Sequence, residues 1–95
     1  MVMEEEALTG QILGCAMKVH SVLGPGFLES VYRKALHHEL MRAGFRVATE
    51  VPIAVHYDGL VAGQFSADLL VEDRVLLELN ANLALALAND VELVN

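Results

Sequence analysis

The chain has 95 residues, of which 55% are hydrophobic and 20% are charged, a balance typical of a small globular domain and not of a disordered chain. Its formal net charge of −7 disfavours nonspecific nucleic-acid binding, because proteins with that activity usually carry a basic surface. The single cysteine excludes a disulfide framework.

The length predicts one domain over residues 1–95, with a small core. No uninterrupted apolar run is long enough to cross a membrane, so we expect no membrane association. The acidic start MVMEEEALTG is unlike a secretory signal, which begins with basic residues. Together with the lone cysteine, this predicts a cytoplasmic protein.

Apolar residues recur at helical spacing in two segments of the first half. The first stripe predicts a helix over 8–23, which the Gly-Pro-Gly sequence at 24–26 ends. The second stripe predicts a helix over 28–43, with Gly44 as its C-terminal stop. The two helices form a predicted helical hairpin with a stiff link.

After the second helix the apolar period changes to two, which predicts strands. The first strand runs to Tyr57 and ends at Asp58-Gly59, a strong hairpin-turn signal. A second strand to Val71, an acidic turn at 72–74 and a third strand from Val75 complete an antiparallel three-stranded meander.

The segment LALALANDVELV carries two opposing signals. Its Leu-Ala alternation is typical of a strand, whereas both residue types are strong helix formers. Asn82 is a favourable N-cap, so we predict a closing helix. The expected fold class is α/β (α+β), with two N-terminal helices, the three-stranded meander and a C-terminal helix.

The hairpin DLLVEDRVLLELNA carries acidic residues whose positions follow from its register. Odd-numbered positions are apolar on both sides of the turn, and a three-residue loop with Val71 opposite Val75 keeps them on one face. This register places Asp68 opposite Glu78 on the other face, with Asn80 next along that face.

Two interpretations of this acidic pair stay open. Like charges opposite each other are unfavourable in a sheet, and a bound divalent cation is one way to compensate for them. Magnesium needs only one or two protein carboxylates besides water and phosphate oxygens. Alternatively, both carboxylates point into water, where solvent screens their repulsion.

The motif GFLESVY at residues 26–32 matches a GxxExxY signature. With the stretches LTGQILGCAMKVHSVLGPG, EVPIAVHYDG and DLLVEDRVLLEL in the same order, the chain resembles the GxxExxY proteins of the PD-(D/E)XK nuclease-like superfamily. The resemblance covers nearly the whole chain and implies a truncated restriction-endonuclease-like core.

The resemblance implies that Asp68 and Glu78 bind Mg²⁺ or Mn²⁺ and that a lysine stands two residues after Glu78. In superfamily nucleases the metal activates water and clamps the phosphate, while the lysine positions or activates the nucleophile. Asn80 occupies that position here, and its neutral, shorter side chain supplies no cation. We therefore expect a nuclease-fold domain with impaired or absent catalysis.

Glu29 and Tyr32 of the signature lie three residues apart, on one face of the second predicted helix. The resemblance implies that Glu29 is an auxiliary acid, as a further metal ligand or as the group that orients a bound water. The alternative is that Tyr32 is a core residue and Glu29 stabilises the helix start, where acids are favoured.

The resemblance also implies a closing strand region, which is not found before Asn95. The sheet edge left uncovered predicts a homo-oligomer to which the C-terminal third contributes. The rival function is therefore a non-catalytic protein-interaction or oligomerisation module that retains the fold. Nucleic acid stays open as a partner, although the acidic charge does not favour it.

Overall fold

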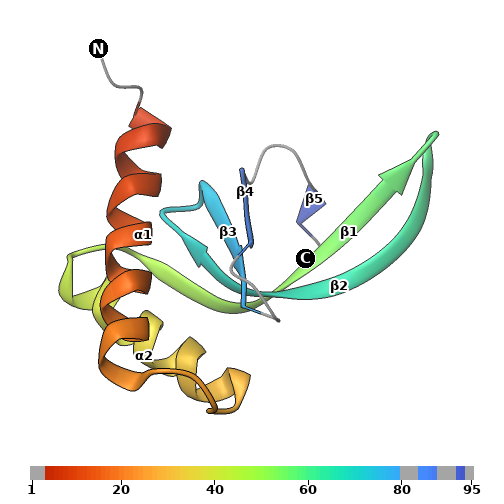
Figure 1. The fold of residues 1–95 in the computed structure, drawn as a ribbon. Helices are drawn as coiled ribbons and strands as arrows, with labels where there is room; N and C mark the ends of the chain where they lie inside the picture. The colour runs from red at the N-terminus through yellow and green to blue at the C-terminus, as the bar shows by residue number, and fades with distance from the viewer. Residues whose placement is uncertain (1–3, 80–83, 88–91, 94–95) are drawn as a thin grey trace. The chain divides into compact units, whose positions relative to one another are not determined.

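The structure is a computed structural model that describes residues 4–79, 84–87 and 92–93 (Figure 1). The chain divides into two compact units, Met1–Phe45 and Arg46–Asn95. The first unit is helical and the second is a β-sheet. The expectation of a single domain over the whole chain stays a prediction.

The helical unit contains α1 (Glu4–Leu23) and α2 (Glu29–Arg42), close to the two predicted helices. The apolar stripes supply its buried residues, which are Leu8, Ile12, Val19, Leu36 and Leu40. An ion pair joins Lys18 Nζ on α1 to Glu39 Oε2 on α2 at 3.2 Å. No described helix is long and apolar enough to span a bilayer.

The second unit is an antiparallel sheet with strand order β4-β3-β2-β1-β5. Its central strands are β1 (Val47–Tyr57), β2 (Leu60–Val71) and β3 (Val75–Glu78), which form the predicted three-stranded meander. Short strands flank it on both sides: β4 (Ala84–Leu87) pairs with β3, and β5 (Glu92–Leu93) pairs with β1. The helices and the antiparallel sheet give an α+β fold.

The expected closing helix is wrong for residues 84–87 and 92–93, which form β4 and β5. The rest of that segment lies outside the described residues. Leu-Ala alternation is compatible with both conformations, and the exposed edge of β3 supplies backbone partners that an isolated segment lacks. Pairing with a neighbouring strand thus overrides the helix propensity of Leu and Ala.

The β1–β2 hairpin turns at Asp58 and Gly59, as predicted. Both residues have positive φ angles, of 50° and 83°, which is the conformation of the two central residues of a type I′ turn. Figure 1 shows the two strands as a long, curved hairpin. The pairing register shifts once, between Val55 and His56.

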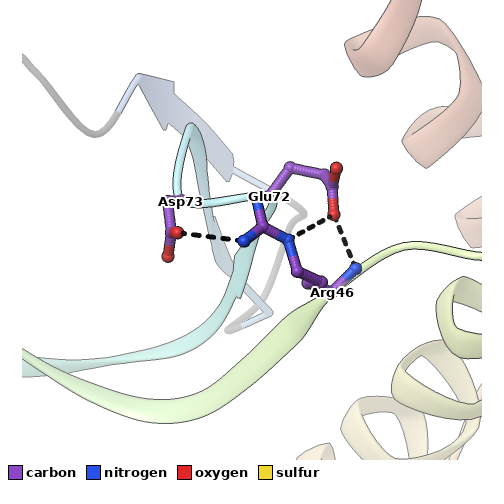
Figure 2. Close-up of polar contacts among 3 residues, drawn as sticks. All are labelled: Arg46, Glu72 and Asp73. Atoms are coloured by element: carbon purple, nitrogen blue, oxygen red, sulfur yellow. Dashed lines mark hydrogen bonds and ion pairs between the residues drawn. The ribbon is translucent and has the colours of Figure 1, made fainter.

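The β2–β3 turn has the predicted register, with Val71 opposite Val75. Arg46, which precedes β1, holds this turn (Figure 2). Its backbone N–H donates to Glu72 Oε2 at 2.7 Å, and its guanidinium lies 3.4 Å from the same oxygen and 3.9 Å from Asp73 Oδ2. The N–H of Arg46 and its charge hold the pKa of Glu72 below its ordinary value. No local pattern in the sequence indicates this contact.

Candidate metal site at the β2–β3 hairpin

Asp68 of β2 and Glu78 of β3 lie opposite each other, because Leu69 pairs with Leu77 immediately beside them. The backbone N–H of Asp68 donates to Glu78 Oε1 at 3.1 Å. In return, the backbone N–H of Leu79 donates to Asp68 Oδ2 at 2.8 Å. Each carboxylate therefore accepts a hydrogen bond from the backbone of the opposite strand, and this reciprocal pair fixes both side chains at the end of the hairpin.

Burial distinguishes this pair from ordinary surface acids. Asp68 is only 6% exposed and Glu78 is half-buried. Burial raises the pKa of Glu78 above its ordinary value; the N–H of Asp68 acts in the opposite direction, and the carboxylate of Asp68 raises that pKa further. The interpretation in which both carboxylates point into water is therefore wrong for Asp68.

Asp68 is buried because the second half of β2 is covered on both faces. All five residues from Ala67 to Val71 are buried, although alternation predicted that only the odd-numbered ones would be. Leu70 and Leu76, on the even positions, belong to a core cluster of Ile53, Ala67, Leu70 and Leu76. The signal was present in the sequence, since both even positions next to the turn are leucines.

The donor set fits a hard divalent cation in part. Carboxylate oxygens are the ligands that Mg²⁺ and Mn²⁺ prefer, and Mg²⁺ commonly takes only one or two from the protein. The hydrogen bond from the N–H of Asp68 engages Oε1 of Glu78, and none from the described residues engages its Oε2. Within the described ranges no group of three or more His, Cys, Asp or Glu side chains gathers to hold a metal. Such a site would depend on water or phosphate oxygens.

The other two predicted site residues are Glu29 and Asn80. Glu29 is the first residue of α2, in the helical unit, whereas Asp68 and Glu78 belong to the sheet unit. Asn80 lies outside the described residues. The auxiliary role of Glu29 and the place of Asn80 beside the carboxylates stay predictions.

The tyrosine of the signature has a local structural role. The hydroxyl of Tyr32 donates to the carbonyl oxygen of Gly24 at 2.6 Å and accepts the N–H of Phe27 at 3.2 Å. Its ring also meets that of Phe27 edge to face, with centroids 6.1 Å apart. Tyr32 is half-buried, and it fastens the interhelical loop to α2. Gly24 and Gly26 adopt positive φ angles of 69° and 103° in this loop, which explains its glycines.

A comparison with protein families adds an independent finding. The family model described as the PD-(D/E)XK nuclease superfamily matches residues 6–95. Comparison with curated proteins and with solved structures gave no significant match. The matched region includes both helices and the hairpin that carries Asp68 and Glu78. The chain therefore belongs to the PD-(D/E)XK nuclease superfamily.

Proposed function

We propose that this domain binds a divalent cation, Mg²⁺ or Mn²⁺, through Asp68 and Glu78 and has impaired or absent phosphodiesterase activity. The observation that carries the proposal is the reciprocal pair of hydrogen bonds, which holds two carboxylates together across β2 and β3. The superfamily commonly uses divalent metals. Asp68 and Glu78 are the acids that the sequence resemblance assigns to its motif.

The electrostatics of the pair support cation binding. Two ionised carboxylates close together in a partly buried place repel each other and lose hydration. Both effects raise the pKa of Glu78 in the free protein. A divalent cation between the carboxylates would offset both, because a bound ion is usually the largest local charge in its site.

The replacement of lysine by Asn80 supports weak or absent catalysis. A bound cation would supply water activation and phosphate clamping in this site. Asn80 can donate hydrogen bonds, but its amide cannot supply the positive charge of a lysine ammonium. Loss of one positioned charge-stabilising group commonly reduces a rate by about 10² to 10³.

Calorimetric titration with Mn²⁺ and Mg²⁺ tests the metal site. We expect the wild type to bind, and Asp68→Asn and Glu78→Gln to lose binding, since each amide keeps an oxygen acceptor but removes a charge. Asp73→Asn is the matched control, because Asp73 lies in the same hairpin with a side chain that is 78% exposed. Binding by Asp68→Asn equal to that of the wild type would overturn the site, provided that circular dichroism shows the same fold.

Cleavage assays on single- and double-stranded DNA and RNA test the catalytic part. We expect little or no Mg²⁺-dependent cleavage by the wild type. The Asn80→Lys variant should cleave faster than the wild type, and adding Asp68→Asn to that variant should abolish the gained activity. Robust cleavage by the wild type that a chelator stops and Asp68→Asn removes would contradict the proposal, because it would show that Asn80 suffices.

The alternative function is a non-catalytic interaction module that retains the fold. One observation favours it: the outer part of the β1–β2 hairpin exposes several large apolar side chains. The two functions are separable, because this surface and the acidic pair use different residues.

A further inference from the structure

The outer part of the β1–β2 hairpin, residues 55–66, is here named the distal arm (Figure 1). Every residue of the distal arm is exposed. Five of them are large and apolar, with exposed fractions from 41% to 73%: Val55, Tyr57, Leu60, Val61 and Phe65. An arm of this kind is unusual for an isolated domain, since contiguous exposed apolar patches mark interaction sites.

Most of these side chains share one face of the arm. Ile53 pairs with Phe65, and Tyr57 pairs with Leu60, and residues directly opposite in an antiparallel pair point to the same side. Alternation along β1 places Val55 and Tyr57 on the face of Ile53. Ile53 itself is fully buried in the sheet core. The apolar face of the core therefore continues onto the arm, where it meets solvent.

The arm also presents an open strand edge. β2 pairs with β3 only over Leu69–Val71, so within the described part of the chain the outer edge of residues 60–67 has no strand partner. The sequence of this edge, LVAGQFSA, contains neither a charge nor a proline. Proteins usually protect exposed edges with such residues, because the free backbone groups otherwise recruit another strand.

The outer edge of β2 can pair antiparallel with the same edge of a second copy. The register shift near the tip leaves residues 63–67 as a regular strand centred on Phe65. Antiparallel pairing about that centre sets Phe65 opposite Phe65 of a second copy and Gln64 opposite its Ser66. The first contact joins two aromatic rings on the apolar face, and the second joins two hydrogen-bonding side chains on the other face.

Charge does not oppose a second copy at this edge. A net charge of −7 makes two copies repel each other in general. The stretch between Asp58 and Asp68 contains no acid, so two copies can pair along it without placing like charges opposite each other. A two-fold axis through the pairing centre closes the assembly as a dimer.

We propose that the distal arm is a homodimer interface in which β2 of one copy pairs antiparallel with β2 of a second copy, centred on Phe65. Main-chain hydrogen bonds supply the affinity, as in other cases of strand addition, and the apolar face supplies side-chain burial. The proposal concerns a different surface from the C-terminal third, whose contribution to a homo-oligomer stays a prediction. It is independent of the metal site.

Size exclusion with light scattering, over a dilution series of the full chain, tests this interface. We expect a dimer that Phe65→Asp weakens by about 30-fold or more, as for a central hot-spot residue, because two acids then meet at the centre. Met17→Asp on α1 is the matched control, since Met17 is 71% exposed and lies in the other unit. Circular dichroism checks that each variant keeps the wild-type fold.

A charge exchange makes the test specific. Mixing Phe65→Asp with Phe65→Lys is expected to give a tighter dimer than either variant forms alone, because opposite charges then face each other across the axis. A wild type that stays monomeric at high micromolar concentration overturns the proposal. So does a Phe65→Asp chain that dimerises as strongly as the wild type, or a mixture that does not associate.

Discussion

The two halves of β2 have opposite environments within one continuous strand. Leu60–Ser66 is exposed at every position, whereas the five residues that follow, Ala67–Val71, are all buried. Both halves are rich in apolar residues, so hydrophobicity alone does not separate them. The buried half has strand neighbours on both sides near the turn, while among the described strands the exposed half pairs with β1 alone. Burial of a strand thus depends on what surrounds it more than on its own composition.

The same comparison explains the contrast between polar residues on β2. Ser66 and Asp68 are two residues apart and occupy equivalent alternate positions. Ser66 meets solvent, but Asp68 is 6% exposed and accepts a hydrogen bond from the backbone N–H of Leu79, which follows β3. A carboxylate in the buried half is therefore held by a backbone hydrogen bond and partly desolvated.

The largest difference between the halves should appear in core truncations. Leu69→Ala removes a fully buried side chain from the covered half and should destabilise the fold by about 2–5 kcal/mol. Phe65→Ala on the distal arm, where the side chain is 42% exposed, should reduce stability much less. Urea unfolding at a concentration where both variants are monomeric measures the two free energies. Equal losses would show that the arm is part of the cooperative core.

A smaller effect is expected from the glycines of the distal arm. Gly59 has a φ of 83° in the hairpin turn, so Gly59→Ala should cost about 1–2 kcal/mol through backbone strain. Gly63→Ala is the matched control, because Gly63 is not in the positive-φ region and an added Cβ meets nothing within 4 Å. Amide hydrogen exchange across the arm, with urea unfolding, reports both changes. A similar cost at both positions would contradict the turn assignment.

The smallest expected effect is a pH dependence at Glu78. Its pKa is raised in the folded state, so folded protein holds this proton to higher pH than unfolded protein does. The contribution of Glu78 to stability is therefore present at acidic pH and is lost as pH rises through the folded pKa. Glu78→Gln keeps an acceptor for the N–H of Asp68. It should slightly raise the Tm at neutral pH and remove this part of the pH dependence of stability.

Glu72 supplies the control of opposite sign. Its pKa is lowered by the N–H and charge of Arg46, so its contribution is present above the ordinary value and is lost as pH falls through the folded pKa. Glu72→Gln should therefore lower the Tm at neutral pH and leave it nearly unchanged in strong acid. Melting curves across the acidic range compare the two variants with the wild type. If the Tm difference changes with pH in the same direction for both variants, the raised pKa of Glu78 is refuted.

Sequence alone determined the features that depend on neighbouring residues. Helical periodicity and the Gly-Pro-Gly loop predicted both helices to within a few residues of α1 and α2. Turn chemistry predicted the hairpin at Asp58-Gly59, and the odd-numbered apolar pattern predicted the register of Val71 with Val75. That register in turn placed Asp68 opposite Glu78, since a one-residue slip would move the apolar side chains of one strand to the opposite face.

Tertiary structure decided the features that depend on residues distant in the chain. Segment 84–87 is a strand because β3 supplies its backbone partners, although its own propensity favours a helix. Arg46 reaches Glu72 and Asp73 across 26 and 27 positions of sequence, a contact that no local pattern announces. Burial of Asp68 likewise follows from the cover on both faces of β2, because the free energy of a carboxylate depends on what lies around it and not on the residues beside it in the chain.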